Sequence, residues 1–213
     1  MAGCCDPRGC DDMFGAGFAR RTAKRYRRRG LDRAAEHIVD FVSSDGLAGA
    51  SVLEIGGGVG ELGLELLRRG AASATTLELS PAYDDEAERL AREAGVADRA
   101  RRRIVDIAAT PDEVEPADIV VMHRVVCCYP DYRRLLSAAA DHCRARLAFS
   151  RPPRNLVSRS LLATQNTAFA LIGKEYRAFV HPPVAMLEVL ADRGLRHVRT
   201  YPGRVWPVEG LAR

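Results

Sequence analysis

The sequence has no hydrophobic run long enough to cross a membrane. No window of the 213 residues reaches the roughly 18 consecutive apolar residues that a membrane-spanning helix needs. The N-terminal segment, MAGCCDPRGCDDMF, also lacks the basic region followed by an apolar region that marks a signal peptide. We therefore expect no membrane span and a cytoplasmic location.

Disulfide bonds are not expected in that compartment, so the cysteines should be free thiols. There are six of them: Cys4, Cys5, Cys10, Cys127, Cys128 and Cys143. The N-terminal spacing C-C-x4-C is not a recognised zinc pattern, and adjacent cysteines rarely both bind one ion. No resident metal is therefore predicted.

Aromatic residues are scarce, at 6%, and the sequence has no internal repeat or low-complexity linker. Few aromatics leave little surface on which nucleic-acid bases could stack. Basic residues gather instead in two clusters, one between Arg20 and Arg33 and one at Arg99 and Arg101 to Arg103. Such clusters attract phosphates or other anions, or they form the solvated face of a helix.

The length and the 47% hydrophobic content suit one domain with a single core. Apolar periodicity alternates along the chain between the strand and helix types. The expected helices cover residues 17–43, 61–70, 82–95, 131–145 and 182–194. Within the first stretch a second helix starts at Asp32 or after a boundary at Gly30. The expected strands cover residues 51–55, 74–79, 102–107, 117–125, 146–150, 195–201 and 204–210.

This alternation predicts an α/β fold with a doubly wound, mostly parallel sheet. The last two strands are joined by a tight Pro-Gly turn, which adds an antiparallel strand at the C-terminal end. Pro207 suits an edge or a bulge of that strand pair. Ligands of such sheets bind at the carboxyl ends of the strands.

A glycine-rich loop, VLEIGGGVGELG, follows the first expected strand. Glycine lets the backbone turn sharply and approach a ligand closely. Gly58, Gly60 and Gly63 match G-x-G-x-x-G, which is typical of dinucleotide binding. The same loop also fits an acidic residue followed by alternating glycines, Glu54-x-Gly56-x-Gly58-x-Gly60.

The second pattern resembles motif I of class I S-adenosylmethionine-dependent methyltransferases, and the resemblance extends over roughly residues 15–211. It implies a Rossmann-like fold, S-adenosyl-L-methionine as the cofactor, and four parts of one domain: an N-terminal helical lid (1–50), a cofactor-binding core (51–150), an acceptor-side insertion (151–181) and a C-terminal helix and strand pair (182–213). By the same resemblance the cofactor contacts Glu54, Gly56, Gly57 and Gly58 in the loop, Glu78 and Leu79 at the ribose, and Asp106 and Ile107 at the adenine. A nicotinamide or flavin dehydrogenase is the competing interpretation, because such enzymes place an acid like Glu78 similarly.

Two further segments are assigned to the cofactor by this resemblance. His123 and Arg124, at the end of the fourth strand, are expected nearest to it. The N-terminal stretch AKRYRRRGL resembles a lid helix that reaches the cofactor's carboxylate, with Tyr26 and Arg29 as candidates, since an arginine fork matches a carboxylate. A plain surface helix is the alternative.

The second half of the chain is similar to magnesium-protoporphyrin IX O-methyltransferases in the stretches CCYPD and RAFVH. Tyr129, Pro130, Arg177 and His181 keep that pattern, whereas Cys128 replaces a histidine and Phe179 replaces a tyrosine. The catalytic candidates are Tyr129, His181 and Cys128, with His181 orienting or deprotonating the acceptor or merely anchoring the turn before Pro182. The expected reaction is O-, S- or N-methylation of a small molecule by in-line displacement.

Other possibilities stay open from the residues alone. Cys127 and Cys128 are apolar fillers, hold a soft substrate in the acceptor pocket, or meet Cys4, Cys5 and Cys10 in a metal site. The arginine clusters suggest a nucleic-acid methyltransferase, although no [DNS]-P-P-[YFW] motif follows the fourth strand. A cysteine-based metal- or thiol-responsive protein is the remaining alternative, and the intact glycine loop argues against it.

Overall fold

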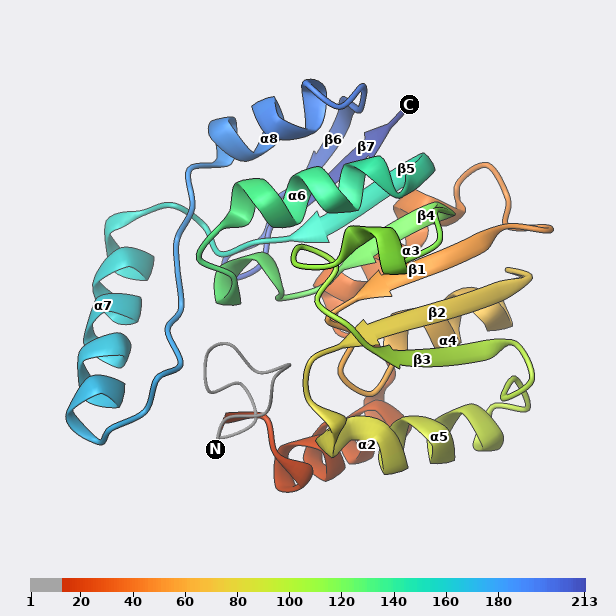
Figure 1. Cartoon of the computed structure of the whole chain (residues 1–213), viewed down its shortest axis with the longest axis horizontal. Coiled ribbons are helices and arrows are strands. Elements are labelled where there is room, and N and C mark those ends of the chain that lie inside the picture. Colours follow the sequence, from red (N-terminus) through yellow and green to blue (C-terminus); the bar gives the residue numbers. More distant parts are fainter. Residues whose placement is uncertain (1–12) are drawn as a thin grey trace.

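Seven strands form one sheet in the order β3-β2-β1-β4-β5-β7-β6 (Figure 1). The computed structural model describes residues 13–213. The strands are β1 (Ser51–Ile55), β2 (Ser73–Glu78), β3 (Ala100–Ile104), β4 (Ala117–Met122), β5 (Cys143–Ser150), β6 (Arg196–Tyr201) and β7 (Val208–Ala212). Strands β1 to β5 run parallel, and β7 runs antiparallel to both β5 and β6. The predicted doubly wound sheet with an antiparallel C-terminal strand is confirmed.

Helices cover both faces of the sheet and divide the core into two layers. One layer contains buried side chains from α2 (Ala16–Arg29), α3 (Arg33–Ser43), α4 (Glu61–Arg68) and α5 (Asp84–Glu93). The other contains those of α6 (Tyr132–Asp141) and α8 (Pro183–Ala191). Strand β1 lies in the middle and is buried from Val52 to Ile55 because both faces are covered.

The helical stretch predicted over residues 17–43 forms two helices, with the boundary where the sequence indicated it. Gly30 ends α2 with a φ of 67°, a left-handed conformation that costs glycine little. Asp32 then starts α3, where its side chain accepts hydrogen bonds from the backbone N–H groups of Ala34 and Ala35. The chain therefore turns between the two helices, and the N-cap carboxylate lies at the turn.

Several predicted boundaries are corrected by the structure. The helix expected over residues 131–145 ends at Asp141, and Cys143 instead begins β5, still in the buried layer below α6. The fourth strand ends at Met122, so His123 belongs to the loop that follows. Residues 202–207 separate β6 from β7 in place of a two-residue turn, and Pro207 precedes β7, where its missing N–H disrupts no ladder.

The segment between β5 and α8 contains helix α7 (Leu156–Leu171), which has no buried side chain. In Figure 1 this helix stands to the left of the sheet, and loops connect it to β5 and to α8. Short 3-10 turns lie at η1 (Pro81–Tyr83), η2 (Pro111–Glu113) and η3 (Val126–Cys128). Within residues 13–213, no helix is both long and apolar enough to cross a membrane.

Candidate active site

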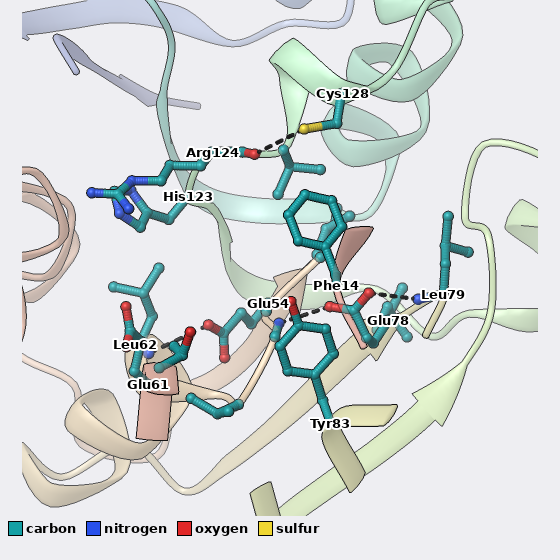
Figure 2. Close-up of a pocket in the computed structure, with 18 of the residues that line it drawn as sticks. Phe14, Glu54, Glu61, Leu62, Glu78, Leu79, Tyr83, His123, Arg124 and Cys128 are labelled. Atoms are coloured by element: carbon teal, nitrogen blue, oxygen red, sulfur yellow. Dashed lines mark hydrogen bonds between the residues drawn. The ribbon is translucent and has the colours of Figure 1, made fainter. Parts of the chain in front are cut away.

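A cavity of about 450 Å³ lies at the carboxyl ends of β1, β2 and β4 (Figure 2). Its walls come from the glycine loop, from the residues that end these three strands and from one face of α2. This volume lies within the range of roughly 300–1,000 Å³ that small-molecule sites occupy. The site is therefore where an open α/β sheet is expected to bind a ligand.

Glycine is required in the loop because a side chain would meet neighbours that hold the cavity together. A Cβ on Gly57 would lie 2.6 Å from Cδ of Glu54 and 2.6 Å from Cγ2 of Thr76. Gly56 has a φ of 64°, and a Cβ there would lie 2.6 Å from Cγ2 of Val125. The backbone of the loop thus packs directly against the side chains of Glu54, Thr76 and Val125, and no side chain of Gly56 or Gly57 fills the cavity.

Glu54 is a buried carboxylate in the cavity wall, with 1% of its surface exposed. It accepts hydrogen bonds from the backbone N–H groups of Leu62 and Gly63, at 3.3 and 3.0 Å, and from the Thr76 hydroxyl at 3.2 Å. Burial raises its pKa to about 7, against these hydrogen bonds, and the charge of Glu61 adds to the increase. Glu54 therefore has three neutral donors around it and would be stabilised as an anion by a cationic partner.

Glu78 ends β2 and points toward the cavity in Figure 2. Its Oε2 accepts a hydrogen bond from the Gly58 N–H at 2.7 Å, and its Oε1 accepts one from the Leu79 N–H at 2.8 Å. Each carboxylate oxygen can accept more than one hydrogen bond. The backbone thus fixes the direction of this carboxylate and leaves it acceptor capacity toward the ligand.

Asp106 and Ile107 lie beyond the end of β3, which is shorter than expected. One Asp106 oxygen accepts a hydrogen bond from the Ala108 N–H, and the other accepts one from the Tyr129 hydroxyl at 3.0 Å. Asp106, Ile107 and Tyr129 all line the cavity. Tyr129, expected on the acceptor side, is therefore bound to the carboxylate assigned to the adenine side.

These residues lie in a segment that matches a known family. Residues 52–146 match the family model described as "Methyltransferase domain". This segment is similar to methyltransferase domains, and the methyltransferase interpretation of the glycine loop is confirmed over that of a dehydrogenase.

Solved structures agree with this methyltransferase fold. Magnesium protoporphyrin IX methyltransferase from Synechocystis PCC 6803 with bound SAH is 21% identical, with a TM-score of 0.76 over 96% of this chain and 97% of that one. An O-methyltransferase family 2 protein from Planctomyces limnophilus in complex with apigenin is 19% identical (TM-score 0.65; 92% and 61% covered). Geranyl diphosphate C-methyltransferase from Streptomyces coelicolor A3(2) is 17% identical (TM-score 0.64; 84% and 78% covered). No curated protein sequence gives a significant match.

His123 and Arg124 connect the cavity to the N-terminal helices through Asp32. The Asp32 carboxylate contacts His123 Nε2 at 3.3 Å and accepts a hydrogen bond from Arg124 Nη2 at 2.5 Å. Burial opposes ionisation of Asp32, but the His123 contact, the Ala35 N–H and the Arg124 charge together hold its pKa well below the usual range.

Arg124 has a φ of 61°, which is strained for a residue with a side chain. Its backbone N–H donates to the Ser150 hydroxyl at 2.9 Å, and its guanidinium lies 5.2 Å from the centre of the Trp206 ring. His123 Nδ1 also contacts the Ser150 hydroxyl at 2.9 Å. The loop after β4 is thus held in one conformation by α3, β5 and the segment before β7.

The lid residues that the sequence suggested do not face the cavity. Tyr26 is buried against α4, where its hydroxyl accepts a hydrogen bond from Arg68, and Arg29 is exposed at the end of α2. The cavity is lined instead by Phe18, Arg21, Thr22 and Arg25. These four positions have the i, i+3, i+4, i+7 spacing of one helix face, and that spacing could have identified them from the sequence. Tyr26 points about 100° away from Arg25 around the helix axis and therefore lies on another face.

Arg25 is held by an acidic residue that the sequence had not singled out. Its Nη2 donates to both carboxylate oxygens of Glu61, at 2.9 and 3.1 Å, and its Nη1 lies 3.5 Å from Asp32. Both Arg25 and Glu61 line the cavity. Arg27 of the same basic cluster is also paired within the chain, with Glu86 and Glu93.

The two other catalytic candidates occupy different positions. Cys128 lines the cavity, with its Sγ 3.0 Å from the Tyr176 hydroxyl and 3.6 Å from Sγ of Cys127. The contact between the two thiols lowers the pKa of Cys128 and raises that of Cys127. His181 does not line the cavity; its Nε2 lies 2.9 Å from the Tyr129 carbonyl oxygen, and burial lowers its pKa. This contact favours the anchoring role.

Cys4, Cys5 and Cys10 lie outside the described residues. Among residues 13–213, no group of three or more His, Cys, Asp or Glu side chains is arranged to hold a metal ion.

Proposed function

We propose that the cavity binds S-adenosylmethionine and that the protein transfers its methyl group to a small-molecule acceptor. The observation that carries this proposal is the Glu78 carboxylate, held by the Gly58 and Leu79 N–H groups at the end of β2 and directed into the cavity. A carboxylate in this position accepts hydrogen bonds from a ribose diol. We assign Glu78 and Leu79 to the ribose, and Asp106 and Ile107 to the adenine.

The remaining wall fits the amino-acid end of the same molecule. Glu54 is buried with only neutral donors, so an ammonium group would favour its anion. Gly56, Gly57 and Gly58 leave room in front of the loop for the chain of the ligand. Arg21 and Arg25, on the cavity face of α2, replace Tyr26 and Arg29 as candidates to contact a carboxylate, and Arg25 would share its guanidinium with Glu61.

The cofactor supplies a methyl group on a sulfonium sulfur, which an acceptor's lone pair displaces in line. The protein's residues contribute mainly by positioning. His123 and Arg124 are fixed by Asp32 and Ser150, which keeps the wall beside the reacting groups rigid. Phe14, Phe18 and Val125 line the cavity with apolar surface and limit the water that reaches it.

Neither Tyr129 nor His181 is placed to act as a general base in the cavity. The Tyr129 hydroxyl donates to Asp106, and His181 lies behind Tyr129 rather than in the cavity. The structures compared above carry or are named for a porphyrin, a flavonoid and an isoprenoid diphosphate, which supports a small molecule as the class of acceptor.

Isothermal titration with S-adenosylmethionine, S-adenosylhomocysteine and NADH tests the proposal. We expect both sulfur compounds to bind the wild type and NADH to fail. Glu78→Ala should weaken binding by at least about tenfold, since hydrogen bonds to a charged group are worth about 1.5–3 kcal/mol. The matched control is Glu88→Ala, whose carboxylate is 73% exposed on α5 and should not affect binding.

Failure of the wild type to bind either sulfur compound would overturn the proposed cofactor. Equal weakening by Glu78→Ala and Glu88→Ala would remove the assignment of Glu78 while leaving the cofactor.

A further inference from the structure

The thiols of Cys127 and Cys128, which are neighbours in sequence, lie side by side in the structure. They occupy the 3-10 turn η3, and neighbouring residues of a helical turn do not normally face each other. Their Sγ atoms nevertheless lie 3.6 Å apart, and both contact the Arg124 carbonyl oxygen, at 3.5 and 3.6 Å. The carbonyl thus holds the two thiols side by side.

One thiol of this pair is accessible from the cavity and the other lies behind it. Cys128 is partly exposed and lines the cavity, whereas Cys127 is 6% exposed. Figure 2 shows the Cys128 side chain at the upper side of the cavity, across from Glu54 and Glu61. A molecule that entered the cavity could reach Cys128 first and then close onto Cys127.

The separation suits a chelated three-coordinate centre. Two bonds of about 2.3 Å, the length of a zinc–thiolate bond, that meet at about 100° put their sulfur atoms about 3.5 Å apart. A disulfide needs about 2.05 Å, far below the observed separation. A structural zinc ion takes four protein ligands, and the described residues offer no such group around the pair.

We propose that Cys127 and Cys128 form a dithiol site for trivalent thiophilic metalloids, such as arsenic(III) species and their monosubstituted organic derivatives. With phenylarsine oxide, two As–S bonds replace the bonds from arsenic to its oxide oxygen, and the two thiol protons leave with that oxygen as water. Arsenic stays trivalent, so no oxidant or reductant is needed. The site goes beyond the proposed methyl transfer and does not depend on which molecule accepts the methyl group.

The test uses phenylarsine oxide and the full chain with Cys4, Cys5 and Cys10 changed to Ser, since Cys4 and Cys5 are also adjacent in sequence. We expect one arsenical per protein in native mass spectrometry and the loss of two of the three remaining thiols. Ethanedithiol should reverse the binding, and an equal concentration of a monothiol should not. Cys127→Ser and Cys128→Ser should each weaken binding by about 100-fold or more, because the second bond is then lost.

Cys143→Ser is the matched control, since Cys143 is a buried lone thiol in β5, and it should leave arsenical binding unchanged. Thermal unfolding of each variant checks that it folds, and Cys128→Ala gives a second test if Cys127→Ser does not fold. Binding as tight in the Cys128 variants as in their parent, or binding that disappears with Cys143, would overturn the dithiol site. Neither readout uses methyl transfer or S-adenosylmethionine, so failure here is distinct from failure of the proposed function.

Discussion

The cofactor end and the acceptor end of the cavity differ in how their side chains are held. At the cofactor end, the carboxylate of Glu54 is fixed by backbone N–H groups of the first turn of α4. That of Glu78 is fixed by N–H groups of the glycine loop and of the residue that follows β2. At the acceptor end, the chain after β5 contributes α7, which has no buried side chain, and Tyr176, which contacts Cys128. The first end is preorganised by the sheet, whereas the second depends on a loosely packed insertion.

This difference matches the general behaviour of α/β folds, in which one scaffold hosts many activities. A site built on strand ends is set by the sheet, and loops around it supply specificity. We therefore expect changes at the cofactor end to affect cofactor binding strongly, and changes at the acceptor end to leave it intact.

The largest effect is expected from Gly57→Ala. The new Cβ would lie 2.6 Å from both Glu54 and Thr76, so the loop or β1 must move. Overpacking of this kind costs about 1–3 kcal/mol of stability, and we expect cofactor affinity to fall by at least about 100-fold because the loop itself shifts. Calorimetry and urea unfolding measure the two effects.

Gly17→Ala is the control for that change. Gly17 lies inside α2, and its nearest neighbour would be 4.0 Å from the new Cβ. Alanine there should stabilise the helix by about 0.5–1 kcal/mol and leave cofactor binding unchanged. A Gly57→Ala variant that binds as well as Gly17→Ala would break the comparison at its strongest point.

The next effect concerns the pH dependence of stability through Glu54. Its pKa rises from the model-peptide value of 4.5 to about 7 on folding, so the folded state holds a proton that the unfolded state releases. The free energy of unfolding should therefore fall as pH rises from about 4.5 to 7, by up to about 3 kcal/mol from this one group.

Glu54→Gln removes that titration. Urea unfolding at pH 5 and pH 8 should show a smaller loss of stability in the variant than in the wild type across this interval, whatever the constant cost of the substitution. Saturating S-adenosylhomocysteine should lessen the wild-type loss, because its ammonium favours the Glu54 anion. Parallel pH profiles for the two proteins would contradict the assignment of the buried charge.

Arg102 gives a smaller effect on the same end of the cavity. Its Nη1 donates to the Gly58 carbonyl oxygen at 2.7 Å, and its Nε donates to Asp84, so it positions the glycine loop from behind. Arg102→Met should raise the KM for S-adenosylmethionine by about tenfold with little change in kcat, since the residue does not reach the cavity. Arg101→Met, exposed on the same strand, is the control; a fall in kcat alone would contradict the positioning role.

The smallest effect on cofactor binding is expected from His181→Ala. Losing its contact with the Tyr129 carbonyl should cost about 1 kcal/mol of stability and leave the affinity for S-adenosylhomocysteine unchanged. A loss of kcat at high acceptor concentration, together with loss of one limb of the pH–rate profile, would instead show that His181 acts as the base. That result would show that a residue at the acceptor end takes part in catalysis, whereas we expect His181 only to anchor the turn.

The sheet was predictable from the sequence, and so was the position of the glycine loop and Glu78 beside a cavity, because both depend on local patterns. The glycine spacing after a short apolar strand identifies Gly56 to Gly58 as the loop. The position of an acid at the end of the next strand identifies Glu78. The contacts of Asp32 were not predictable in this way. Asp32 starts a helix, as its residue type suggests, but its contacts with His123 and Arg124 join segments about 90 residues apart in sequence.

The lid assignment failed for a different physical reason. Arg25 and Tyr26 are adjacent in sequence but point about 100° apart on α2, so an error of one position selects the wrong face. Tyr129 was expected on the acceptor side because of its position in the chain, and it does line the cavity. Its hydroxyl in fact reaches back to Asp106 beyond β3.

Amide hydrogen exchange with and without S-adenosylhomocysteine tests the central claim most directly. We expect slower exchange in the glycine loop, residues 56–60, and at the ends of β2 and β3, residues 77–80 and 105–108. We expect no change in α7. Protection confined to α7, or no protection anywhere at saturating ligand, would contradict the assignment of this cavity to the cofactor.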